Sequence, residues 1–220
     1  MKRKQKIIIS IAIIIAVVVS VMAYIFIQSK PKTTPFSDAN SQSIQDTEPE
    51  SATYKEYAAL KGESYDKAFL SGMIVHHSVA ITMSEQAGAS TEREEILNLT
   101  TEINDAQSKD MMEMIALQTK FGFPITNGHD MSNMGNAGAS MDAMMTMSEE
   151  LQGLTGEAFD KKFLESMVIH HKDAIDMSRS AQTNARSQEV KDLARSIISN
   201  QQQEIDQMKA WQIEWGFVDQ

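Results

Sequence analysis

The chain has 220 residues, a formal net charge of −10, sixteen methionines and no cysteine. The acidic balance argues against a nucleic-acid partner, because such proteins displace phosphate counterions with clustered Lys and Arg. Without cysteine, neither disulfides nor thiolate metal sites can form, so any binding of soft metals would have to use the methionines.

An apolar segment at residues 7–27 follows four basic residues among the first six. About 20 apolar residues are needed for a helix to span a bilayer, and basic residues before the first span stay in the cytoplasm. We therefore expect residues 1–28 to be a single-pass anchor in the cytoplasmic membrane, with the folded part outside, periplasmic or at the cell surface. A cleaved signal peptide is the alternative, but the apolar segment is longer than usual for one and no A-x-A-like site follows it.

Residues 29–53 are rich in Ser, Thr, Pro, Asp and Gln and have few large apolar side chains. Such a segment buries too little apolar surface to offset the entropy of ordering. We predict a disordered tether here, with the folded domain at 54–220.

The folded domain contains an internal repeat, with copies at 65–123 and 159–217. The segment from Tyr65 to His77 matches the segment from Phe159 to His171 without gaps, and the register holds to the end of each copy. Self-similarity of this kind indicates that one structural unit has been duplicated.

Apolar residues recur at spacings of three and four in each copy, which predicts helices at about 65–87 and 92–121 and at the matching positions of the second copy. Gly122 and Gly216 stand where a glycine would end the second helix of each copy. One hairpin leaves an apolar face exposed, so two hairpins are expected to pack as an all-α four-helix bundle. A connector at 125–155 joins them.

A histidine pair lies on the inward seam of the first helix in each copy. Thioether sulfur prefers Cu(I) and imidazole suits copper generally, so the pattern points to copper, with Cu(I) favoured and Cu(II) as an option. Methionine at helical spacing also fills cores, but the duplication of the whole pattern favours a metal. The candidate ligands are Met73, His76, His77, Met83, Met167, His170, His171 and Met177.

The second helix of each copy carries polar residues where a bundle would normally place leucines. Buried polar groups need partners, and the histidines are the natural ones, as contacts that fix the imidazole tautomer or as additional ligands. The candidates for this role are Gln107, Asp110, Met114, Gln201, Glu204 and Met208.

The connector is rich in methionine and short of other large apolar residues. It either hands Cu(I) between thioethers as a flexible segment or forms a short amphipathic helix at about 141–151 that covers the bundle. His129, Met131 and Met134 are further candidate ligands here.

With the His-His-x-x-Ala-Ile-x-Met signature present twice, residues 54–217 resemble the domain-of-unknown-function family 305 (DUF305). The resemblance implies a ferritin-like four-helix fold and extracytoplasmic copper binding, for sequestration, delivery or tolerance, with the His and Met of the signature as ligands. A copper exporter or another copper protein would be a fitting partner. Di-iron members of the wider ferritin-like group use Glu-x-x-His, whereas Met73 and Met167 replace that glutamate here.

The leading functional hypothesis is therefore a copper-binding protein that is not an enzyme. A metal-dependent oxidoreductase, with Asp110, Glu204 and the paired histidines as a redox centre, is one alternative. A structural or adaptor bundle whose histidines serve only as hydrogen-bonded core residues is the other.

Overall fold

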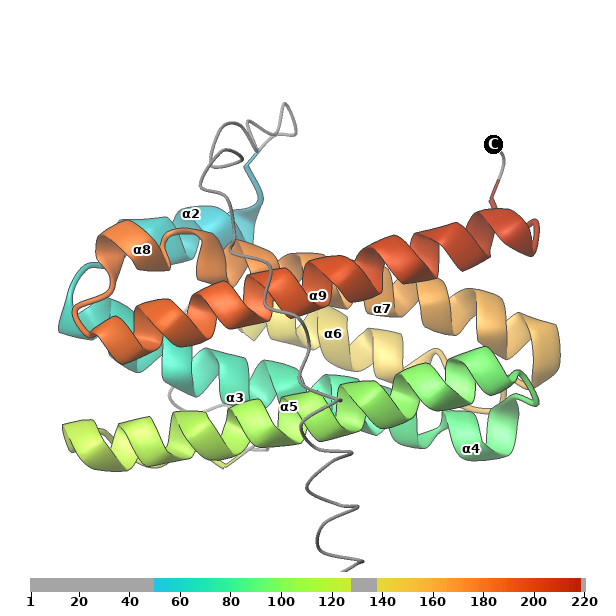
Figure 1. The fold of residues 1–220 in the computed structure, drawn as a ribbon, viewed down its shortest axis with the longest axis horizontal. Helices are drawn as coiled ribbons and strands as arrows, with labels where there is room; N and C mark the ends of the chain where they lie inside the picture. The colour runs from blue at the N-terminus through green and yellow to red at the C-terminus, as the bar shows by residue number, and fades with distance from the viewer. Residues whose placement is uncertain (1–49, 128–137, 219–220) are drawn as a thin grey trace, which may run out of the picture. The chain divides into compact units, whose positions relative to one another are not determined.

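The computed structural model describes residues 50–127 and 138–218, and regular structure in these residues is helical, apart from one isolated β-bridge between Gly62 and Ala185. In chain order the helices are α2 (Ala52–Ala59), α3 (Glu63–Glu85), α4 (Ala87–Ser90), α5 (Glu94–Phe121), α6 (Gly138–Glu149), α7 (Gly156–Arg179), α8 (Ala181–Asn184) and α9 (Gln188–Glu214) (Figure 1). The predicted anchor at 1–28 lies outside the described residues. Within them, no helix combines the length and apolarity that a membrane span requires.

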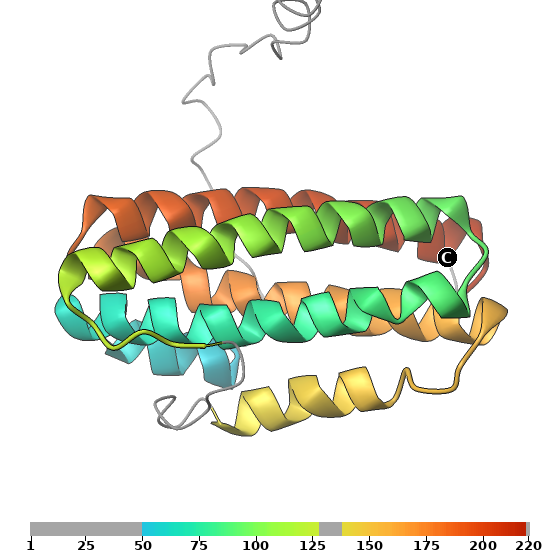
Figure 2. The ribbon, with the colours of Figure 1, turned by 90° about the horizontal axis from the view of Figure 1, so that it is seen from below.

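Four long helices form two hairpins, and each hairpin corresponds to one copy of the repeat. α3 packs along α5, α7 packs along α9, and α3 also contacts α7. The helices predicted at 65–87 and 92–121 are thus present as α3 and α5. Figure 2 shows α5 and α9 in one layer and α3 and α7 in the next. The short helices α4 and α8 are related by the same offset of 94 residues that separates His76 from His170.

α2 was not expected from the sequence, and it begins inside the segment predicted as a tether. The Ser51 side chain caps it by accepting a hydrogen bond from the backbone N–H of Tyr54. Thr53 and Tyr57 are buried because α2 packs on α7. An eight-residue helix with two buried residues leaves little periodicity in the sequence, which explains why it was missed.

α6 lies within the predicted connector, so of the two alternatives for that segment a helix is what the structure has at 138–149. α6 packs on α3, just as α2 packs on α7. The helix that leads into each hairpin therefore covers the other hairpin, on the outer side of the α3 and α7 layer (Figure 2). His129, Met131 and Met134 lie outside the described residues.

Glycines end the second helix of each hairpin, as the sequence predicts. Gly122 has φ 71°, in the left-handed region, and its N–H bonds to the carbonyls of Gln118 and Thr119. Gly216 likewise has φ 71°. Side chains with a Cβ are strained in this conformation, so the glycines stop both helices at equivalent points.

Two buried aspartates join the hairpins near the helix ends. Asp66 on α3 accepts hydrogen bonds of 2.9 Å from the backbone N–H groups of Arg186 and Ser187, before α9. Its repeat counterpart Asp160 on α7 accepts a 2.8 Å hydrogen bond from Arg93 Nε, before α5. Each carboxylate thus holds the opposite hairpin, and charge-assisted bonds of this kind are stronger than neutral ones.

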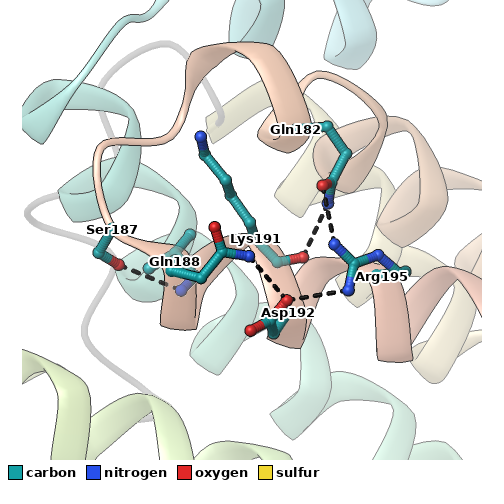
Figure 3. A network of polar contacts seen from close by, with 7 residues as sticks. Gln182, Ser187, Gln188, Lys191, Asp192 and Arg195 are labelled. Carbon is teal, nitrogen blue, oxygen red and sulfur yellow. Dashed lines mark hydrogen bonds and ion pairs between the residues drawn. The ribbon is translucent and has the colours of Figure 1, made fainter.

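The turn between α8 and α9 is also fixed by a surface network (Figure 3). Arg195 donates to Asp192 at 2.9 Å and to Gln182 at 3.0 Å, and Gln182 donates to the Lys191 carbonyl at 2.8 Å. Ser187 caps α9 by accepting from the Val190 N–H. Exposed charge pairs contribute little stability, so this network shapes the turn rather than the bundle.

The core consists of two apolar clusters, each built from both hairpins. The Phe69 cluster joins the start of α3 to the end of α7; among its members are Tyr65, Phe69, Leu70, Met73, Met114, Ala174, Met177, Leu193 and Ile197. The Phe163 cluster joins the start of α7 to the end of α3; among its members are Met83, Ile96, Leu99, Ile103, Phe159, Phe163, Leu164, Met167 and Met208. Burying each large apolar side chain contributes about 1.5–3 kcal/mol, so the clusters are the main source of bundle stability.

A close contact between α2 and α3 depends on Gly72. A Cβ at this position would lie 2.2 Å from the Tyr57 hydroxyl oxygen and 3.1 Å from the Met177 methyl group. Tyr57 is only 3% exposed and cannot easily swing away. At the matching positions of the second repeat stand Ser166 and Leu151, so the residue with a Cβ occurs where the tyrosine hydroxyl is absent.

We predict that Gly72→Ala destabilises the protein by about 1–3 kcal/mol, since the overpacking outweighs the gain of up to about 1 kcal/mol from removing a helical glycine. Urea unfolding measures this. Adding Tyr57→Phe should recover most of the loss, because it removes the clashing oxygen. Gly88→Ala is the matched control, since its Cβ would meet nothing within 4 Å. Equal stability of Gly72→Ala and the parent would contradict the packing described here.

Candidate metal centre

The four paired histidines meet in one buried layer between the two apolar clusters. His76 and His77 lie on α3, His170 and His171 lie on α7, and none is more than 1% exposed. The ring centroids of His76 and His170 are 3.8 Å apart. The structure thus brings the histidine pairs of both hairpins together.

Carboxylates from α5 and α9 contact the second histidine of each pair. His171 Nε2 is 2.6 Å from Glu204 Oε2, a hydrogen bond. His77 Nε2 is 3.6 Å from Asp110 Oδ2, which is too long for a good hydrogen bond but is still a close polar contact. The polar positions identified on the second helix of each repeat therefore face the histidines. With 15% and 16% of their side chains exposed, Asp110 and Glu204 stand at the margin of the layer.

A third carboxylate, which the sequence did not reveal, belongs to Asp173 on α7. Its Oδ2 is 3.5 Å from His76 Nε2, and its Oδ1 accepts a 2.6 Å hydrogen bond from Thr53 Oγ1 on α2. The counterpart of Asp173 in the first repeat is Val79, so comparing the repeats gave no signal. Its position three residues after His170 was the available clue, because such residues share a helix face.

Many polar atoms in this layer have no hydrogen-bond partner among the described residues. They include both ring nitrogens of His76 and His77, Nδ1 of His170 and His171, both amide atoms of Gln107 and Oε1 of Gln201. Each such buried atom costs about 1–3 kcal/mol when left unsatisfied. A bound polar ligand or metal ion would explain why so many unsatisfied polar atoms lie in one layer, since ring nitrogens are metal ligands.

The methionines flank the histidine layer on both sides. On the long helices, each cluster has a triad of buried methionines: Met73, Met114 and Met177 in the Phe69 cluster, and Met83, Met167 and Met208 in the Phe163 cluster, to which Met144 of α6 also belongs. Each triad takes two methionines from one repeat and one from the other. Met73 and Met83 are ten residues apart on one helix, or roughly 15 Å. The structure thus separates these two candidate ligands and sets methionines of different repeats together, with the Met177 methyl beside Gly72.

The described residues do not contain a preformed set of three His, Asp or Glu side chains at metal-binding distance of one another. The donors that they supply are two imidazole pairs, three marginal carboxylates and two sets of three thioethers, each set within one apolar cluster. Imidazole and thioether suit copper and silver, whereas carboxylate and imidazole suit harder divalent ions. The arrangement therefore offers soft donors on both sides of a nitrogen-rich centre.

Burial keeps the imidazoles of His77 and His170 neutral. Desolvation, together with the neighbouring His76, His171 and His77, holds the pKa of His170 well below its usual range. Desolvation likewise lowers the pKa of His77, although Asp110 opposes the shift. Neutral imidazole is the form that binds metals, so these rings are ready as ligands at neutral pH.

The sequence and fold match one protein family and several solved structures. The family described as "Domain of unknown function (DUF305)" matches residues 29–118 and 66–212. CopM in an Ag-bound form is 30% identical, with a TM-score of 0.54, covering 68% of this chain and 96% of CopM. The Cu(I)-bound form is 29% identical with a TM-score of 0.53, and the match covers 68% of this chain and 96% of CopM. The Cu(II)-bound form is 28% identical with a TM-score of 0.56, and the match covers 71% of this chain and 99% of CopM.

A putative secreted DUF305 protein from Streptomyces coelicolor shares the fold, with a TM-score of 0.58 at 24% identity over 69% of this chain and 93% of that one. None of the curated proteins matches the sequence.

We predict that the metal-free protein loses stability as the pH falls below about 6.5, the usual pKa of histidine. In the unfolded chain His77 and His170 then bind protons, whereas both stay neutral in the folded protein. The free energy of unfolding therefore falls by at most about 1.4 kcal/mol per pH unit for each of the two histidines. Urea unfolding between pH 7.5 and 5 measures the slope. His170→Gln should reduce it. A pH-independent free energy of unfolding in the parent would contradict the burial of neutral histidines.

Proposed function

The chain belongs to the DUF305 family, and we propose that it is a copper-binding protein that holds the ion between its two repeats. The observation that carries this proposal is the convergence of both histidine pairs in one buried layer, with the His76 and His170 rings 3.8 Å apart. The paired hairpins thus act as one site, and neither repeat alone has the full donor set.

The donor types favour copper over the other common metals. With no cysteine in the chain, the soft donors of the core are methionines, namely the six of the two triads and Met144 on α6. Thioether and imidazole together suit Cu(I), and imidazole with carboxylate suits Cu(II). The Cu(I)-bound, Cu(II)-bound and Ag-bound forms of CopM support this choice.

The proposed setting is outside the cytoplasm. The apolar run 7–27, after Lys2, Arg3, Lys4 and Lys6, would anchor the chain in the cytoplasmic membrane, with the bundle outside and the tether predicted at 29–53, as far as it precedes α2, as the link. In that position the protein would sequester copper or deliver it to a copper exporter or another copper protein. The proposed role is binding rather than catalysis.

We predict that the full-length chain, purified in detergent, binds Cu(I) and Cu(II) in competition titrations. A variant with Gln in place of His76, His77, His170 and His171 should lose most of this affinity, and circular dichroism should show that it remains helical. His129→Gln, which changes one histidine in the connector, should bind like the parent. If the fourfold variant binds copper like the parent, the site lies elsewhere, and the connector methionines are the next candidate ligands.

We also predict that the methionine triads act on Cu(I) alone. Replacing Met83, Met167 and Met208 together by Leu removes three sulfurs with little change in volume, so the free energy of unfolding should change by less than about 1.5 kcal/mol per substitution. Cu(I) affinity should fall at least tenfold while Cu(II) affinity is kept. Met112 and Met145, 66% and 44% exposed, supply the control when changed to Leu. Unchanged Cu(I) affinity in the triad variant would make these methionines core filler.

A further inference from the structure

The two repeats treat their histidines differently. In the second repeat, His170 Nε2 contacts the His76 carbonyl at 3.1 Å and His171 Nε2 bonds to Glu204 at 2.6 Å. In the first repeat, both ring nitrogens of His76 and of His77 have no hydrogen-bond partner among the described residues. The first repeat therefore presents available nitrogen donors, whereas the second uses one nitrogen of each ring to fix its position.

His76 points at a carboxylate across a gap of the size that a metal ion spans. Its Nε2 is 3.5 Å from Asp173 Oδ2. Two ligands about 2.1 Å from one ion, at a tetrahedral angle, are about 3.4 Å apart. The 2.6 Å separation between His171 and Glu204 leaves no such space. His76 and Asp173 thus form an interhairpin pair of nitrogen and oxygen donors.

α2 holds this carboxylate in place and adds negative charge. Thr53 donates to Asp173 Oδ1, which leaves Oδ2 turned toward His76. Partial burial and the charge of Asp173 raise the pKa of Glu56, so Glu56 stands within electrostatic reach of Asp173. The side chain of Asp173 is 14% exposed, compared with 1% for His76. Asp173 therefore lies at the edge of the contact between α2 and α7, and His76 lies in the buried layer beside it.

We infer that His76 and Asp173 form a nitrogen and oxygen site for a divalent transition-metal ion such as Cu(II), separate from the thioether triads. The inference rests on the proposed copper binding and adds a second kind of site to it. Water would complete the coordination, because two protein donors alone do not fill it. Val79 stands at the equivalent place in the first repeat, so the duplication does not repeat this pairing of a first histidine with an aspartate.

The test is Asp173→Asn in the full-length chain. Asparagine keeps the acceptor for Thr53 and nearly the same shape, but it loses the charge and the anionic donor. The matched control is Asp176→Asn, which removes the same charge from α7 one turn further on, at a residue that pairs with Arg179. Competition titrations with Cu(II) and Cu(I), and electron paramagnetic resonance spectra of the Cu(II) form, are recorded for the parent and both variants.

We expect Asp173→Asn to weaken Cu(II) binding at least tenfold and to change the Cu(II) spectrum, with Cu(I) affinity unchanged and Asp176→Asn like the parent. Unchanged Cu(II) affinity would overturn the inference. Equal losses for Cu(I) and Cu(II) would also overturn it, since Asp173 would then only orient His76. A parent that binds Cu(I) but not Cu(II) would refute this site and leave the proposed function standing, whereas a parent that binds neither ion would refute both.

Discussion

The contact between His76 and His170 is the interaction on which the rest of the structure depends. The two hairpins contact each other where these rings meet. Burying four imidazoles costs free energy, and polar groups around the rings have to offset this cost. Asp110, Glu204 and Asp173 stand at the margin of the layer, while the apolar clusters close it from both sides. The bundle is therefore two apolar cores separated by a polar layer that neither core can satisfy.

Duplication explains how such a layer is assembled. Each repeat brings one histidine pair on its first helix and one carboxylate on its second, and the antiparallel packing of α3 on α7 sets the pairs side by side. The same packing divides the methionines of each repeat between the two clusters. A donor set of this kind needs both copies, but the copies are free to diverge, as Asp173 and Val79 have done.

The sequence predicted the long helices, their glycine ends and the facing of Asp110 and Glu204 toward the histidines, because helical periodicity and the repeat register determine them. It could not predict which methionines meet, since a repeat register says nothing of contacts between copies. Asp173 was missed because the first repeat has no carboxylate at the matching position. α2 was missed because a helix of eight residues leaves little periodicity in the sequence. The anchor and tether remain predictions, as does the assignment of the copper ligands.

Anomalous X-ray scattering at the copper absorption edge, from crystals of the copper-loaded chain, tests the central claim most directly. The account predicts a peak between α3 and α7 within bonding distance of the paired histidines, with donors from both repeats. A peak bound only by the connector at residues 128–137, or by residues of one repeat alone, would contradict it.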